Sequence, residues 1–244
     1  MASCPCESHA AIEAAAAHLL SASRVFTQKN LFYAVRRALS TIGATCRHDW
    51  PAFCAGPLAR QLRGRPLPGL LPPASPGRRR RIPAEWDAYF PAAILLVDRP
   101  ELVNLIAASG ALVQARIAPV AIDGTPAHVV RWLVNGFRRG QRAPIAYVHD
   151  AATRIYPFLY QPLTTLIELT QGEPLPYRDL GLPPAGLPAS AFPFTAGLSP
   201  DEQIDELEQL PPAACVAYAV RGALSLVPPD PLLAPIKPAS RRKR

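Results

Sequence analysis

The chain has 244 residues, 49% of them hydrophobic, which is enough for one sizeable domain or two small ones. Its formal net charge is +8 at pH 7, and a basic chain attracts polyanions such as nucleic acids through phosphate contacts and counterion release. No run of about 18 apolar residues occurs, which argues against a membrane span. The N-terminus has no basic segment followed by an apolar one, so we expect no secretory signal and a cytoplasmic protein, associated with the nucleoid if it is bacterial.

Residues 1–62 are predicted to form a helical module. An alanine-rich segment at residues 10–23 predicts one helix. A second helix is expected from Gln28 to Thr41, with Thr27 as its N-cap, because apolar residues recur at helical spacing through this segment. Two short helices followed by a turn are compatible with a winged-helix DNA-binding module.

Residues 63–88 are interpreted as a linker. The chain contains 30 prolines, and prolines and glycines between Gly56 and Pro83 argue against long regular elements there. A basic run follows, Arg78, Arg79, Arg80 and Arg81. Such a run is either a solvated segment or a phosphate contact.

Residues 89–226 are predicted to form an α/β domain. Apolar segments of strand length at 92–97, 118–122 and 145–148 alternate with helical patterns at 100–109, 126–137 and 155–169. This alternation predicts a parallel sheet covered by helices on both faces. Two further helices are expected near 201–210 and 213–224, and residues 227–244 are expected to be a disordered basic tail.

Polar residues follow the ends of the predicted strands. Asp98 follows the first strand, Asp123 the second, and His149 and Asp150 the third. Chemistry in open parallel sheets gathers at the carboxyl ends of the strands. These residues are therefore the first candidates for a functional site.

Five cysteines are present. Cys4, Cys6, Cys46 and Cys54, together with His48, could be assembled into a zinc site, although their spacing matches no common zinc pattern. The alternative is a set of free thiols in a reducing compartment.

The order of motifs in residues 90 to 165 resembles the Toprim domain of topoisomerase VI A subunits and of the related meiotic double-strand-break transesterase. The matching segments are a strand ending in Asp98, then Gly124-Thr125-Pro126 at a helix start, and a strand followed by Asp150. The resemblance implies an N-terminal winged-helix-like module, a Toprim-like parallel sheet with Pro-rich connecting segments, and a homodimer that acts on DNA.

The family also carries a catalytic tyrosine upstream of this domain, in a pattern similar to Lys29-Asn30-Leu31-Phe32-Tyr33. The resemblance implies that Tyr33 attacks a phosphodiester and forms a covalent phosphotyrosyl link. Lysine stands here where the family has arginine. The alternative interpretation of Tyr33 is a partly buried aromatic side chain of the helix.

The resemblance further implies Mg²⁺, held by Asp98 and Asp150, which would stabilise charge on the phosphate and the leaving oxygen. Asp98 replaces the family's glutamate, and Ala152 occupies the place of a second aspartate. Glu101 or Asp123 could compensate for the missing acid. The alternative is a purely structural role, in which Asp98 and Asp150 cap loops or helix starts.

Two functions remain open at this point. The chain is either a reduced type IIB topoisomerase A-like enzyme, which would need a separate ATPase subunit for strand passage, or a non-catalytic DNA-binding or complex-organising protein with the same fold. A third possibility is an α/β domain with no role at DNA. The side chains expected to contact phosphate are Lys29, Arg36, Arg37 and the run Arg78 to Arg81.

Overall fold

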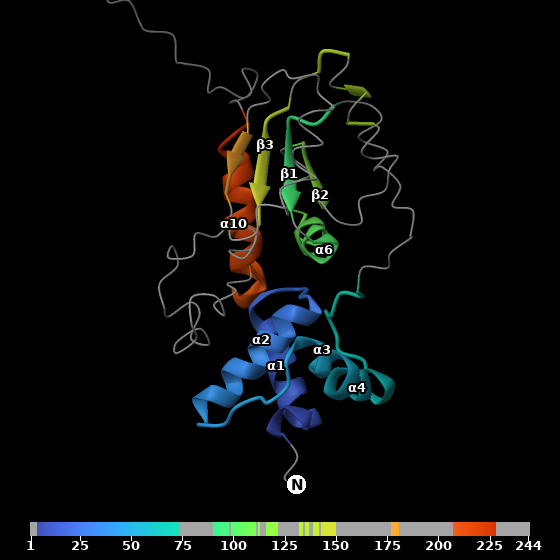
Figure 1. Cartoon of the computed structure of the whole chain (residues 1–244), viewed down its shortest axis with the longest axis vertical. Coiled ribbons are helices and arrows are strands. Elements are labelled where there is room, and N and C mark those ends of the chain that lie inside the picture. The colour runs from blue at the N-terminus through green and yellow to red at the C-terminus, as the bar shows by residue number, and fades with distance from the viewer. Residues whose placement is uncertain are drawn as a thin grey trace, which may run out of the picture.

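A computed structural model of the chain describes residues 4–73, 90–97, 99–110, 112, 116–121, 132–133, 135–136, 139–141, 143–149, 177–180 and 207–227. These residues form a mixed α/β structure, as expected, with N-terminal helices next to a parallel sheet (Figure 1). Within these residues, no helix is both long enough and apolar enough to cross a bilayer.

The helical unit begins with a 3-10 helix, Pro5–Glu7, and two long helices, α1 (His9–Ala22) and α2 (Gln28–Thr41). Three short elements follow: α3 (Trp50–Phe53), a π-helical turn (Cys54–Leu58) and α4 (Ala59–Gly64). They share one apolar core, whose largest fully buried side chains are Ile12, Phe26, Leu31, Phe53 and Leu58.

Helix α2 begins where the sequence predicts because its first turn carries a complete capping box. The Thr27 hydroxyl accepts a hydrogen bond from the Asn30 backbone N–H at 3.1 Å, and the Asn30 side chain accepts one from the Thr27 N–H at 3.0 Å. Two N–H groups that a helix start leaves without partners are thereby satisfied. The expected bounds, Gln28 to Thr41, are confirmed.

The sheet contains β1 (Ala93–Val97), β2 (Ile117–Ala121), β3 (Ile145–Val148) and the short β4 (Tyr177–Asp179). Their order is β2-β1-β3-β4, and all three pairings are parallel. Every residue of β1 and β3 is buried, which fits strands covered on both faces.

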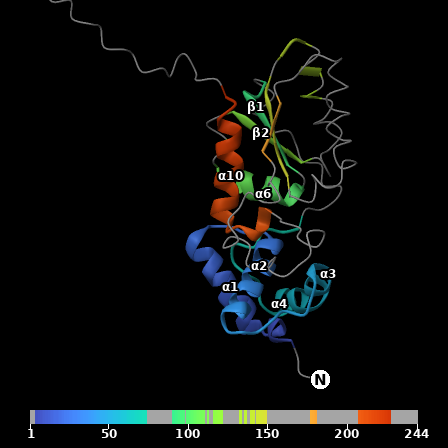
Figure 2. The same ribbon diagram turned by 60° about the vertical axis from the view of Figure 1, so that its left-hand side comes forward.

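Two helices lie on one face of this sheet (Figures 1 and 2). They are α6 (Pro100–Ala108) and α10 (Pro212–Leu224), and they pack against Ala93, Leu95 and Val97 of β1. The alternate residues Ile94 and Leu96 belong to a second apolar cluster on the other face. The period-two alternation of side chains thus divides β1 between two cores.

Some expectations differ from the structure. The segment after Gly56 was expected to lack long regular elements, and the described part contains only short ones: a π-helical turn to Leu58, α4 to Gly64, and a β-bridge between Leu70 and Phe26. Strand β4 was not predicted. The helix expected near residues 201–210 is described only as a 3-10 helix, Leu207–Gln209. The helix expected at 155–169 and the tail after residue 227 lie outside the described residues, and the helix expected at 126–137 is described only in part.

Candidate functional site

The carboxyl ends of β1 and β3 lie side by side. Val97, the last residue of β1, is paired with Val148, the last residue of β3. The next strand along the chain, β2, lies on one side of β1, whereas β3 and then β4 lie on its other side. In doubly wound sheets, ligands bind where the strand order reverses in this way. The strands point toward the helical unit, so this edge faces α2 (Figure 1).

A pocket of about 310 Å³ lies between this edge and the helical unit. Its volume falls at the lower end of the range of small-molecule and cofactor sites. Charged side chains come from both units: Lys29 from α2, Arg99 and Glu101 from the start of α6, and Glu208 from the C-terminal segment. The remaining lining residues are Thr27, Gln28, Trp50, Leu71, Pro72 and Pro73.

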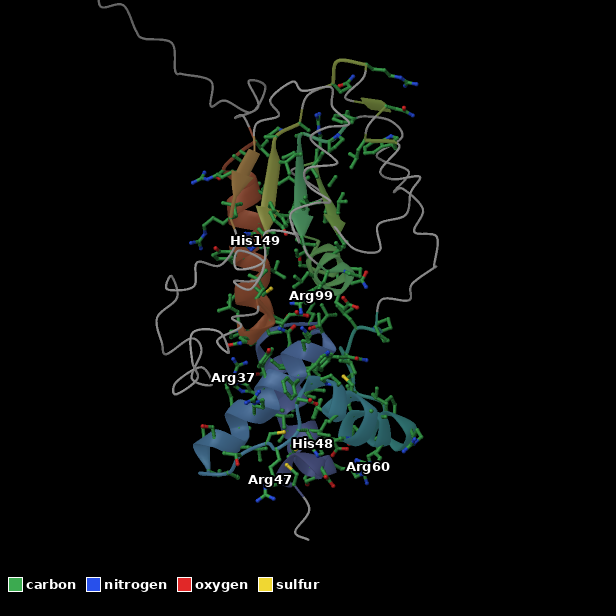
Figure 3. All side chains as sticks on the ribbon, in the orientation of Figure 1. Arg37, Arg47, His48, Arg60, Arg99 and His149 are labelled. Atoms are coloured by element: carbon green, nitrogen blue, oxygen red, sulfur yellow. The ribbon has the colours of Figure 1, made fainter. Side chains whose placement is uncertain are left out.

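A buried ion pair closes one wall of the pocket. Arg99, the residue before α6, pairs with Glu208, whose side chain is only 1% exposed (Figure 3). The other carboxylate oxygen of Glu208 accepts a hydrogen bond from the Thr27 hydroxyl at 2.8 Å. The Asn30 amide donates to the Glu208 backbone carbonyl at 3.0 Å. The capping box of α2 is therefore joined to the sheet through one buried carboxylate.

Arg37 has a structural partner at the same junction. Its guanidinium donates a hydrogen bond to the Gln209 backbone carbonyl. Burial lowers the pKa of Arg37, because loss of hydration disfavours the charged form. This arginine, expected to contact phosphate, holds α2 against the segment that carries Glu208.

Two other cations expected to contact phosphate lie along one strip with aromatic side chains. The Lys29 ammonium lies 5.8 Å from the ring centroid of Trp50, and the Arg36 guanidinium lies 5.4 Å from that of Phe32. The two rings meet edge to face, 5.7 Å apart. We call Lys29, Phe32, Arg36 and Trp50 the basic–aromatic strip. Lys29 and Trp50 also line the pocket, so the strip continues into it.

Tyr33 lies in the core of the helical unit. Its residue is 8% exposed, and its ring packs edge to face on Phe32 with centroids 5.2 Å apart. The position matches the partly buried aromatic side chain that the sequence analysis gave as its alternative interpretation of Tyr33.

Asp98, Asp150 and the run Arg78 to Arg81 lie outside the described residues. The residues before the two aspartates are described. Val97 ends β1, and His149, fully buried, follows β3 and packs at a tilt against Tyr147 with ring centroids 4.7 Å apart.

A second cluster brings together thiols and an imidazole at the base of the helical unit. One ligand atom each from Cys4, Cys6 and His48 lies within 4.8 Å of the other two. The Cys4 and Cys6 sulfurs are 2.7 Å apart. Burial raises the pKa of Cys6, and hydrogen bonds with Cys4 and Cys46 raise it further. Sulfur and imidazole nitrogen are ligands for zinc rather than for the Mg²⁺ expected at Asp98 and Asp150.

Sequence reasoning did not predict the Arg99–Glu208 pair. Thr27 and Glu208 are separated by 181 residues, and no local pattern indicates that a glutamate in a proline-flanked segment returns to the first helices. The only available signal was the place of Arg99, directly after Asp98 at a strand end.

Comparison of the chain with models of known protein families, with curated proteins and with solved structures finds no match.

Proposed function

We propose that this protein binds DNA through its helical unit and the adjoining carboxyl edge of the sheet, without cutting it. The observation that carries the proposal is the continuity between the basic–aromatic strip and the pocket at the ends of the strands. Cations bind phosphates, and the partly exposed Trp50 ring offers a base a stacking surface, whereas Phe32 is buried beneath it.

The charge of the helical unit supports this proposal. Residues 4–73 contain eight arginines and lysines and three acids. Two of the acids, Glu7 and Glu13, are already paired with Arg60 and Arg65. The unit therefore has an excess of positive charge, which favours phosphate over acidic partners.

The sheet edge supports a role for a divalent cation as well. Asp98 follows β1 directly, and Glu101 lines the pocket, which suits the compensating role suggested for it from the sequence. Mg²⁺ retains several waters and needs only one or two carboxylates. Asp98, Asp150 and Glu101 are the side chains that would hold the ion, which would supply charge neutralisation at a bound phosphate.

For the fold, we propose a Toprim-like sheet preceded by a winged-helix-like module. For the assembly, the family resemblance implies a homodimer with a possible separate ATPase subunit. The burial of Tyr33 and the replacement of the family's second aspartate by Ala152 favour a protein of this type that has lost strand cleavage. Tyrosine transesterification by Tyr33 is the competing function.

A plasmid assay separates these functions. Supercoiled DNA is incubated with the protein and Mg²⁺ or Mn²⁺, treated with detergent and protease, and resolved on a gel beside an untreated binding reaction. We expect a salt-sensitive mobility shift and no protein-linked breaks. Linked breaks that disappear in Tyr33→Phe would establish the enzyme instead, and the absence of both shift and breaks at low salt would exclude a role at DNA.

A further inference from the structure

We propose that Cys4, Cys6, Cys46 and His48 bind a structural Zn²⁺ ion. The four residues come from two short segments with the same arrangement, Cys4-Pro5-Cys6 and Cys46-Arg47-His48, each with one residue between its ligands. The first segment enters the 3-10 helix before α1, and the second lies between α2 and α3. The packing of α1 against α2 brings them together across about forty residues of sequence.

The geometry fits one ion. Zinc binds sulfur at about 2.3 Å and nitrogen at about 2.0 Å, so the ligand atoms of a tetrahedral site are roughly 3.5–3.8 Å apart. The ligand atoms of Cys4, Cys6 and His48 all lie within 4.8 Å of one another. The 2.7 Å between the two sulfurs is shorter than a tetrahedral edge, so a rotation of the Cys4 or Cys6 side chain accompanies binding.

Cys46 supplies the fourth ligand. Cys46 lies outside the group of ligand atoms formed by Cys4, Cys6 and His48, but it interacts with the Cys6 thiol and raises its pKa. Its sulfur is 3.8 Å from the His48 carbonyl oxygen, so a rotation of its side chain brings it to the ion. It is half-buried and belongs to the rim of the same apolar cluster as Cys4 and Cys6. Four protein ligands close the coordination sphere, which is the arrangement of structural rather than catalytic zinc.

The surroundings of His48 provide independent support. Its Nε2 is 3.0 Å from a carboxylate oxygen of Glu7, and the other oxygen of Glu7 is 3.2 Å from Arg60 (Figure 3). This leaves Nδ1 for the ion. Histidines that bind zinc commonly donate their second ring N–H to a carboxylate, which fixes the ring and its tautomer.

The surroundings of Cys4 point the same way. The Arg47 backbone N–H donates a hydrogen bond to the Cys4 sulfur at 3.3 Å. Such a donor stabilises an anionic sulfur more than a neutral thiol. The second segment thus supplies ligands and also supports Cys4, while Glu7, directly after the first segment, supports His48.

The ion would fasten the N-terminal segment to the connection between α2 and α3. Neither segment is held by regular secondary structure over its whole length. Because a site of this kind does not exist in the unfolded chain, the free energy of binding adds to the stability of the helical unit.

The test measures metal content and coordination in the full-length protein purified under reducing conditions. We expect one zinc per chain by mass spectrometry of the metal, and replacement by Co²⁺ should give the visible bands of a tetrahedral thiolate site. Cys6→Ser and His48→Ala should lose both signals. Cys54→Ser and Cys215→Ser remove free cysteines that are not among the four proposed ligands, and both variants should keep the two signals.

Two further variants guard against a loss of folding. His48→Cys should retain the ion and strengthen the thiolate charge-transfer band, and Glu7→Ala should fold but bind zinc about 10- to 100-fold more weakly. Absence of stoichiometric zinc and of tetrahedral Co²⁺ bands in the reduced wild-type protein would overturn the proposal. So would equal zinc content in the wild type and a folded Cys6→Ser variant, or a stable disulfide within the cluster in place of metal.

Discussion

Gly69 shows how a single residue fixes the path of the chain between the two units. Its φ is +74°, and a Cβ atom there would lie 2.4 Å from Leu20 Cδ2 and 2.9 Å from the Arg24 carbonyl oxygen. Its own carbonyl accepts a hydrogen bond from the Phe26 N–H at 3.0 Å. The position requires both a left-handed backbone and the absence of a side chain.

Gly69→Ala should therefore destabilise the protein by about 2–4 kcal/mol, the sum of backbone strain and steric overlap. Gly43→Ala is the matched control, since Gly43 has φ +71° but nothing within 4 Å of the added Cβ. It should cost only about 1 kcal/mol. Urea unfolding of both variants measures the difference, and equal losses would show that the close approach to Leu20 and Arg24 is not maintained.

Tyr33 and Lys29 show how much of a single residue's environment the sequence predicts. The motif around them predicted a helix with a cation and an aromatic ring near its start, and the structure has both on α2. Whether the ring faces solvent or core depends on Phe32, Trp50 and Phe53, which come together only after folding. Burial of Tyr33 was accordingly one of two interpretations that the sequence could not separate.

At the scale of the element, α2 combines a local signal with a distant one. Its capping box is formed by Thr27 and Asn30, which are only three positions apart, so the start of the helix was predictable from local sequence. The Thr27 hydroxyl also donates to Glu208, a contact that no local pattern indicates. Thr27 thus caps α2 and also connects the helical unit to the segment that carries Glu208.

Thr27→Ala should cost about 2–3 kcal/mol, of which roughly 1 kcal/mol is the lost cap and the rest is the loss of a hydrogen bond to a buried carboxylate. Asp49→Ala provides the comparison, because Asp49 caps α3 through the Ala52 N–H at 2.9 Å in an exposed position. That variant should lose only about 1 kcal/mol. If chemical denaturation gave the same loss for both, the bond to Glu208 would contribute nothing.

The short helical elements between Trp50 and Gly64 were not predicted one by one, because distant contacts hold them in place. Gly56 and Pro57 are poor residues for a helix interior, yet they lie in a π-helical turn that continues into α4. The buried side chains of Phe53 and Leu58 hold that turn in the core. By contrast, β1 and β3 are continuous apolar runs and α10 has a regular periodic pattern, so local sequence was sufficient for them.

At the scale of the whole molecule, the Arg99–Glu208 pair joins the helical unit to the sheet. Removing one partner leaves the other charge poorly compensated, so Glu208→Ala should destabilise the protein by about 3–5 kcal/mol. The double variant Arg99→Met with Glu208→Leu removes both charges and should be more stable than the single Glu208 variant. Additive losses in denaturant titrations would contradict a direct coupling between the two residues.

The parallel sheet and its strand ends were predictable, because the alternation of apolar runs with helical patterns implies them. The docking of α2 against the segment that carries Glu208 was not, because it depends on contacts across most of the chain. The candidate site lies at that docking surface. Of the acids that line it, Glu101 was a candidate from the sequence, whereas Glu208 and the walls of the pocket required the structure.

The salt dependence of DNA binding tests the central claim most directly. The dissociation constant for a labelled duplex is measured by fluorescence anisotropy at a series of salt concentrations for the wild type, for Lys29→Gln/Arg36→Gln, and for Arg63→Gln/Arg65→Gln, which removes the same charge away from the basic–aromatic strip. We predict that the slope of log K against log salt becomes shallower by about two in the strip variant only. Equal slopes in all three proteins, or no binding by the wild type at low salt, would contradict the account.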